Sequence, residues 1–275
     1  MKKTLLPILI IALCYSCSTP VKEKSEQEKQ DSIQTASEVQ DLNTPAPGFN
    51  VEESDAIAII TADKVMKAMG GKKAWDNTRY IKWNFFGLRK LLWDKETGDV
   101  RIEMMKDSLT MLMNVNEMTG KVQKNGEILK DSVEYYLDMG KRIWINDSYW
   151  LVMPFKLKDS GVTLTYLGES ETIAGEPANL LQLTFDNVGV TPDNKYQIWI
   201  SNETDLVSQW AYYPNASDSV PRFTLPWTDY VQKGDILLSG ERGDRDLTEI
   251  EVYEDLPADH FTDFEAKIPS DDPAL

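Results

Sequence analysis

The chain has 275 residues, of which 45 are Asp or Glu and 29 are Lys or Arg, so its formal net charge is −16. This charge excludes a protein that neutralises nucleic-acid phosphates, and it disfavours attachment to anionic lipid headgroups by overall charge. The hydrophobic fraction of 41%, with eight tryptophans, is sufficient for one domain with a sizeable core.

The N-terminus carries the pattern of a secretion signal. A Met-Lys-Lys start precedes an apolar run over residues 4–13, which is too short to span a bilayer. Cys17 follows the small residue Ser16 and precedes a polar segment, an arrangement that resembles a bacterial lipobox. We therefore predict a lipoprotein signal peptide over residues 1–16 and acylation of Cys17, as in palmitate-bearing lipoproteins. Cleavage at Cys14 and an ordinary cleaved signal are the alternatives.

Residues 17–54 have the composition of a flexible linker. Lys, Glu, Gln, Ser, Asp, Thr and Pro dominate, so the segment buries too little apolar surface to offset its chain entropy. Asp31-Ser32-Ile33 matches the short sequon that some Bacteroidota-type bacteria O-glycosylate. We predict the folded domain over residues 55–265 and an acidic tail over residues 266–275.

The domain is predicted to begin with a helix over residues 55–69, which Gly70-Gly71 ends. An antiparallel meander follows, in which Gly98 and Asn125-Gly126 supply the turns. Its predicted strands cover residues 78–86, 88–93, 100–105, 109–116 and the two arms of a hairpin over residues 121–130.

A second helix is predicted over residues 131–148, although Gly140 weakens it and is a candidate break. The stretch over residues 143–159 is the centre of the chain, because strands precede it and follow it. Its second half is an apolar run that contains Pro154, which suits neither a helix interior nor a central strand. We predict a buried crossover that fills the concave side of a curved sheet.

Strands resume after this stretch, with Pro226 marking a bulge or an edge. They are predicted over residues 162–167, 181–185, 196–200, 206–213, 222–231, 235–239 and 247–253. Short turns between strands favour antiparallel pairing. The predicted fold is therefore α+β and mainly β, a curved antiparallel half-barrel of about ten strands wrapping one or two helices.

Three segments carry a resemblance to known proteins: Ala68-Met69-Gly70-Gly71 with Trp75, residues 149–159, and the hairpin over residues 196–207. They resemble a group of uncharacterised Bacteroidota-type lipoproteins and, at the level of the fold, the LolA/LolB superfamily of lipoprotein carriers. The resemblance implies a half-barrel around helices, with an apolar cavity for acyl chains. No short motif transfers a ligand-binding residue, and a fold does not determine a function.

Candidate catalytic chemistry is sparse. His260 is the single histidine and lies near the C-terminal end, which argues against a Ser-His-Asp triad or a histidine metal site. The acidic segments at residues 186–193 and 243–246 lack the spacing of a calcium loop and are interpreted as polar turns. No pair of carboxylates stands out. We predict no catalytic residue, metal or cofactor, with a carboxylate-based hydrolase as a minor alternative.

The predicted function is that of a lipoprotein anchored in the outer membrane through N-terminal acyl chains, on the periplasmic face of the cell envelope. It would bind a lipid or an acyl chain in the half-barrel, with a role in envelope lipid or lipoprotein handling. The alternative is a scaffold lipoprotein with a filled core that binds a protein or glycan through its loops. The residues predicted to line the cavity are Trp144, Trp150, Met153, Phe155, Trp199, Trp210 and Trp227.

Overall fold

The computed structural model of the chain describes residues 43–186 and 193–269. The predicted signal peptide, Cys17 and the sequon at residues 31–33 lie outside these residues, as do parts of the predicted linker and acidic tail. The first helix is α2 (Ala56–Ala68), and it is followed by the short helix α3 (Lys72–Asn77). Gly70 and Gly71 separate the two helices, both with positive φ, as predicted.

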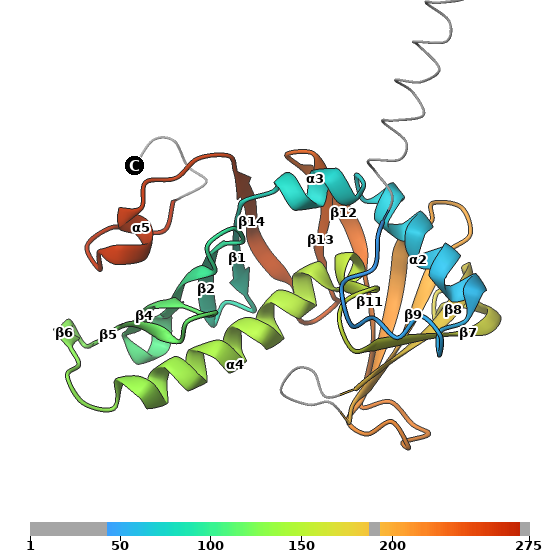
Figure 1. Cartoon of the computed structure of the whole chain (residues 1–275), viewed down its shortest axis with the longest axis horizontal. Coiled ribbons are helices and arrows are strands. Elements are labelled where there is room, and N and C mark those ends of the chain that lie inside the picture. The colour runs from blue at the N-terminus through green and yellow to red at the C-terminus, as the bar shows by residue number, and fades with distance from the viewer. Residues whose placement is uncertain (1–42, 187–192, 270–275) are drawn as a thin grey trace, which may run out of the picture. The chain divides into compact units, whose positions relative to one another are not determined.

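Three antiparallel sheets form the folded unit (Figure 1). The largest has the order β14-β1-β2-β3-β4-β5-β6, the second β11-β10-β9-β8-β7, and the third contains β12 and β13. The predicted fold class is confirmed, because the sheets are antiparallel, curved and open around a helix. The strands of the first sheet are β1 (Tyr80–Phe85), β2 (Arg89–Asp94), β3 (Asp99–Met104), β4 (Leu109–Asn114), β5 (Thr119–Lys124), β6 (Glu127–Ile128) and β14 (Leu247–Tyr253). The others are β7 (Val162–Glu171), β8 (Pro177–Phe185), β9 (Lys195–Ser201), β10 (Val207–Tyr213), β11 (Phe223–Pro226), β12 (Thr228–Lys233) and β13 (Ile236–Glu241).

The long helix α4 (Val133–Val152) crosses the inner side of the first sheet toward the second (Figure 1). It does not break at Gly140, which is buried in the middle of the helix. A Cβ at this position would lie 2.6 Å from the Met113 sulfur and 3.1 Å from the Met111 sulfur. The glycine therefore lets the helix approach β4 closely, which compensates for its low helix propensity.

The second half of the central stretch is buried, as predicted, and the predicted helix extends beyond residue 148. Helix α4 continues to Val152, and a 3-10 helix (Met153–Lys156) follows directly. Pro154 lies in the first turn of that 3-10 helix, where its missing N–H costs no hydrogen bond. The apolar side chains on either side of it pack into one core together with both large sheets.

The C-terminal segment covers the outer face of the first sheet. Tyr80 and Leu92 point away from the main core and form a separate small cluster with Phe261, on the short helix α5 (Asp259–Thr262). The buried cation Lys82 donates to the carbonyl of Pro269 at 2.9 Å, and Arg101 donates to the carbonyl of Asp263 at 2.9 Å. Both faces of β1 are therefore buried.

Residues 43–54 also pack against the domain, although their composition predicts a linker. Phe49 is buried, and the N–H of Ala46 donates to the carbonyl of Lys158 at 2.9 Å. The Asn50 amide donates to Thr163 and Asp186, both at 2.9 Å. Polar groups of this segment form hydrogen bonds with the edge strand β7. The segment is therefore ordered through its polar residues, which composition alone does not reveal.

Phe155, a predicted cavity residue, stacks on Trp75 instead, with ring centroids 4.4 Å apart. The ammonium of Lys95 lies 3.7 Å from the centroid of the Trp75 ring and donates to the carbonyls of Trp75 and Thr78. These carbonyls belong to the end of α3, so Lys95 acts as its C-cap. Burial lowers the pKa of Lys95 to about 8.

A pKa below the ordinary lysine value means that the folded state disfavours the charged amine. The cost is fully present below pH 8 and disappears as the pH rises through the unfolded-state value, near 10.5. Relative to Lys95→Met, the wild-type chain is expected to gain up to about 3 kcal/mol of stability between pH 7 and pH 10.5. Urea unfolding of both chains across this range measures the difference, and a difference that does not change with pH would contradict the shift.

An aromatic cavity at the end of helix α4

A cavity of about 350 Å³ opens where the last turns of α4 meet the second sheet. Trp144, Tyr149 and Val152 line it from α4, and Trp93 lines it from β2. The second sheet contributes Phe185 and Tyr196 from β8 and β9, together with Val162 from β7. The lining is predominantly apolar, and its hydrophilic residues are Asn146, Ser148, Lys156, Asp159, Ser160 and Asn194.

Aromatic contacts fix the walls of the cavity. Trp144 meets Trp93 edge to face, with ring centroids 5.3 Å apart and an interplanar angle of 74°. Tyr149 contacts Tyr196 at 5.2 Å, and Tyr196 stacks on Trp210 at 5.5 Å. Each ring therefore contacts another ring that belongs to a different element, which limits how far the walls can collapse into the open space.

The walls offer no free charge. Lys156 and Asp159 form an ion pair of 2.5 Å with each other. The Trp144 indole nitrogen and the Tyr149 hydroxyl have no hydrogen-bond partner among the described residues, but both atoms are covered by protein. Burial raises the pKa of Tyr149 well above its ordinary value, so the phenol stays neutral. The cavity therefore suits an apolar ligand rather than an ionic one.

An ion pair holds α4 against the first sheet beside the cavity. Arg89 donates to both carboxylate oxygens of Asp147, from Nε at 2.8 Å and from Nη2 at 3.0 Å. The Asp147 side chain is fully buried, and Asn146 donates to it at 2.9 Å. Burial raises the pKa of Asp147, although the hydrogen bonds from Arg89 act in the opposite direction. This bidentate pair sets the rotation of α4 and so determines which side chains face the cavity.

Of the seven predicted cavity residues, the structure places Trp144 and Trp150 in the lining. Met153 is fully buried in the core, and Phe155 packs on Trp75. Trp199 is half-buried, with its indole N–H donating to Ser170 at 3.3 Å. Behind the cavity, the buried Trp210 ring meets Trp150 at 4.7 Å and Trp227 at 5.1 Å, both edge to face. The seven residues are thus divided between wall, core and strand surface.

Four aromatic wall residues were not predicted from the sequence: Trp93, Tyr149, Phe185 and Tyr196. Tyr149 lies inside the central stretch, so its position was the one available signal. Trp93 and Phe185 lie close to the ends of their strands, β2 and β8, where alternation gives no information about the neighbouring element. Only the docking of α4 between the two large sheets brings these rings together.

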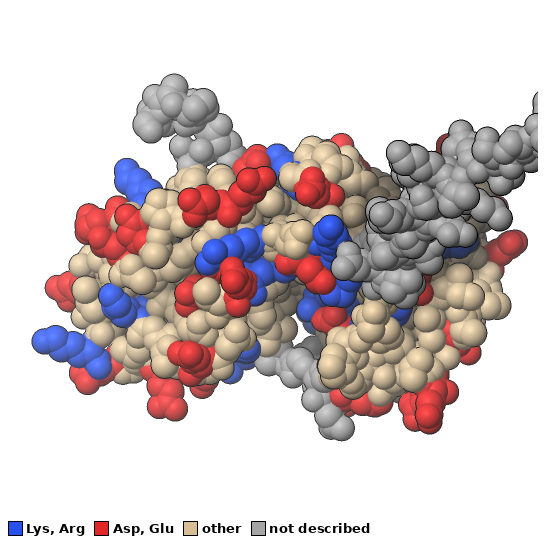
Figure 2. Space-filling view, turned by 45° about the horizontal axis from the view of Figure 1, so that its top comes forward, with Lys and Arg blue, Asp and Glu red and all other residues tan. Residues whose placement is uncertain are grey.

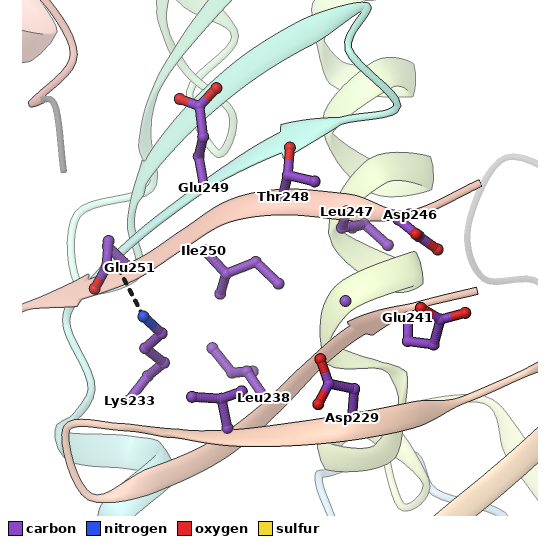
Figure 3. Close-up of a pocket in the computed structure, with 12 residues that line it drawn as sticks. Asp229, Lys233, Leu238, Glu241, Asp246, Leu247, Thr248, Glu249, Ile250 and Glu251 are labelled. Carbon is purple, nitrogen blue, oxygen red and sulfur yellow. Dashed lines mark hydrogen bonds and ion pairs between the residues drawn. The ribbon is translucent and has the colours of Figure 1, made fainter. Parts of the chain in front are cut away.

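A second cavity, also of about 350 Å³, lies between β13 and β14, which belong to different sheets (Figure 3). Leu238 and Ile250 face each other across it, whereas Glu249 points away (Figure 3). Glu251 pairs with Lys233 at 2.7 Å, and Glu249 accepts from Lys90 at 2.7 Å. Burial raises the pKa of Glu249, but hydrogen bonds from Lys90 and Asn84 act in the opposite direction, so its pKa lies below the ordinary value.

These carboxylates do not form a general-acid pair, because Glu249 and Glu251 each bind a cation and the lowered pKa keeps Glu249 ionised at neutral pH. Within residues 43–186 and 193–269, no three His, Cys, Asp or Glu side chains are arranged to hold a metal ion. Acidic and basic side chains are interspersed over the surface shown in Figure 2. None of the described helices is long and apolar enough to cross a membrane.

The fold and the site together define an open antiparallel half-barrel around a helix, with an aromatic cavity at the end of that helix. Solved structures with similar architecture include a DUF1329 family protein from Desulfovibrio piger, at 14% identity and a TM-score of 0.41. That likeness covers 74% of this chain and 96% of the other.

Two further solved structures have a similar architecture. One is an outer membrane lipoprotein-sorting protein domain from Vibrio parahaemolyticus, at 9% identity and a TM-score of 0.34, over 73% of this chain and 97% of the other. The second is a LolA superfamily protein from Nitrosomonas europaea, at 12% identity and a TM-score of 0.33, over 74% and 96%. The LolA superfamily, to which the sequence bears a resemblance, is thus named among these structures, whereas the Bacteroidota-type lipoprotein group stays a prediction. At these TM-scores we take no function from them. No protein-family model matches the chain, and no curated protein does.

Proposed function

We propose that this protein is a membrane-anchored lipoprotein of the cell envelope that binds a lipid or an acyl chain in the cavity at the end of α4. The observation that carries this proposal is the cavity itself, whose walls are aromatic and aliphatic and hold no unpaired charge. Such a site discriminates against ionic groups and accepts hydrocarbon.

The size of the cavity agrees with this ligand class. Small-molecule pockets have volumes of about 300–1,000 Å³, and this one has about 350 Å³. Each buried methylene contributes about 0.8 kcal/mol, so eight of them supply about 6 kcal/mol before the cost of immobilising the ligand. Micromolar binding needs about 8 kcal/mol net, so an acyl chain that enters end-on must bury more than eight methylenes or gain contacts of its polar end with Asn146 and Lys156.

The predicted acylation of Cys17 gives the cellular setting, an anchor in the outer membrane with the domain on the periplasmic face. A lipid-binding domain held there would take part in envelope lipid or lipoprotein handling. Purification of the full chain, followed by solvent extraction and mass spectrometry, tests both parts. We expect a co-purifying lipid and a diacyl or triacyl group on Cys17, and an empty chain with an unmodified Cys17 would contradict the proposal.

A tryptophan at the exposed position Asn146 is expected to obstruct the cavity. Asn146 lies on α4 and lines the cavity, so the larger ring occupies the entry, while the hydrogen bond from Asn146 to Asp147 is lost. Titration with parinaric acid, a fluorescent fatty acid, measures the effect. Asn146→Trp is expected to weaken binding about tenfold or more, which corresponds to about 1.4 kcal/mol.

Arg142 provides the matched control, because it is exposed on the same helix one turn earlier and lies outside the cavity lining. Arg142→Trp is expected to bind parinaric acid with an affinity within about twofold of the wild-type value. Equal binding by the wild-type chain and Asn146→Trp would place the ligand elsewhere.

One observation favours the scaffold alternative. Trp150, Met153, Phe155, Trp210 and Trp227 already fill much of the space between the sheets. In that reading the cavity is a packing defect, and a protein or glycan binds the loops. The absence of both a co-purifying lipid and parinaric acid binding would favour it.

A further inference from the structure

Helix α2 presents an apolar stripe outward, although its inner face is already packed against the domain. The inner face buries Ala58, Ala62 and Val65. On the opposite face, Ile57 is 56% exposed and Ile60 is 57% exposed. Lys64 and Lys67 continue the same face, because the spacing 57, 60, 64 and 67 keeps side chains on one side of a helix.

No other described helix exposes two large aliphatic side chains one turn apart. Tyr135 on α4 and Met105 in the 3-10 helix Met105–Asp107 are each the single such residue on their helix, and the other exposed apolar residues, such as Leu88, Ile173 and Val220, lie on strands, turns or loops. Lys64 and Lys67 form no ion pair with a described residue. The four side chains together form what we call the outer stripe of α2, apolar at its start and cationic at its end.

The chain enters the folded unit beside this stripe. The side-chain amide of Asn43, the first described residue, donates to Asp63 of α2 at 2.9 Å. Lys158 holds the same carboxylate at 2.5 Å, so the entry point is attached to the helix and to the core beneath it. Any segment that precedes Asn43 must therefore leave the domain next to the outer stripe.

Only a short stretch separates the predicted anchor from the folded unit. Between Cys17 and Asn43 lie 25 residues, which span at most about 80–90 Å when fully extended. An acylated Cys17 would thus keep α2 within reach of the bilayer surface. An interfacial helix buries aliphatic side chains at the headgroup boundary and places lysines among anionic headgroups, which is the chemistry of the outer stripe.

We propose that the outer stripe of α2 docks the domain onto an anionic lipid bilayer. The net charge of −16 opposes this globally, but salt screens distant charges within about 8–10 Å, so the local lysines dominate at contact. Glu52 and Glu53, exposed before the helix, lie near its positive N-terminal end rather than among the lysines. This inference rests on the anchoring in the proposed function but not on the cavity.

Site-specific quenching tests the docking. The full chain carries Cys14→Ser and either Ile60→Cys or Ile128→Cys, labelled with an environment-sensitive fluorophore, and is reconstituted into phosphatidylethanolamine–phosphatidylglycerol vesicles. A fraction of the lipids carries a nitroxide on the headgroup. Ile128 is the matched control, because it is 58% exposed at the β5–β6 hairpin. Labelling of the Cys14→Ser chain alone gives the background at Cys17.

Quenching at position 60 is expected to exceed that at position 128 about threefold, and Lys64→Glu with Lys67→Glu should reduce the excess. Equal quenching at the two positions, or stronger quenching at 128, overturns the docking. A chain that binds parinaric acid but shows equal quenching keeps the cavity and loses this inference. Preferential quenching at position 60 without parinaric acid binding supports the docking and argues against a lipid-binding cavity.

Discussion

Replacement of Asp147 by alanine is expected to lower the free energy of unfolding by about 3–5 kcal/mol. Asp147 is fully buried on α4 and accepts two hydrogen bonds from Arg89, which is itself only 18% exposed. Removal of the carboxylate leaves a largely buried guanidinium without its anion, which costs more than the pair contributes. Urea unfolding of the purified chain, followed by tryptophan fluorescence, measures the change.

The double variant Arg89→Met with Asp147→Leu is the control for this interpretation. Both positions then become apolar at similar volume, and a buried ion pair is often replaced by hydrophobic residues at little cost. We expect the double variant to recover most of the stability that Asp147→Ala loses. An alanine variant within about 1 kcal/mol of wild type would show that water reaches Arg89 and that the pair does not fix α4.

The second large effect is expected at Arg242, which is fully buried and pairs with no carboxylate through its side chain. Its guanidinium lies 3.4 Å from the Trp227 ring centroid and donates to the carbonyls of Trp150 and Ser239, both at 3.0 Å. It thereby joins the end of α4 to β13. Burial lowers the pKa of Arg242 to about 9, so the site holds this cation at a cost.

Arg242→Met is expected to destabilise the chain by about 3 kcal/mol, because it leaves buried carbonyls unpaired and removes the contact with the indole. The melting temperature should then fall by about 6–12 °C, as measured by calorimetry. A lysine at position 242 should not restore the stability, since one ammonium cannot reproduce the planar set of donors of the guanidinium.

Arg245 lies in the same loop and is exposed, so Arg245→Met tests whether the effect belongs to the buried position. We expect its melting temperature to remain within about 2 °C of wild type. Comparable decreases of the melting temperature in Arg242→Met and Arg245→Met would mean that the positive charge of the loop, rather than the buried guanidinium of Arg242, stabilises this part of the domain.

The Arg89–Asp147 pair and Arg242 both hold helix α4, which carries part of the cavity walls. Asp147 sets the rotation of α4 against the first sheet, and Arg242 holds its C-terminal end against the third. Along the helix, Tyr149 lies between these two attachments and Trp144 lies about one turn before the first. The aromatic walls on α4 therefore belong to a helix that is attached to both the first and the third sheet.

Local features of the fold follow from the amino-acid sequence alone. The turn at Asn125-Gly126 was predicted from its residue types, and both residues have positive φ, 52° and 81°. Gly70-Gly71 ends the first helix for the same reason. Turn chemistry, helix capping and strand alternation depend on neighbours within a few residues, so the sequence carries them completely.

The site was determined only by the tertiary structure. Alternation shows that Tyr80 and Ile81 point to opposite faces, but not that a C-terminal segment covers one of them. Aromatic composition indicates a core, but not that Trp93, Phe185 and Tyr196 surround an open space while Trp210 and Trp227 pack solidly. Arg89 and Asp147 lie 58 residues apart, and no local pattern pairs them. Residue types and their spacing determine which side chains seek burial, whereas the docking of α4 between the sheets decides which become wall and which become core.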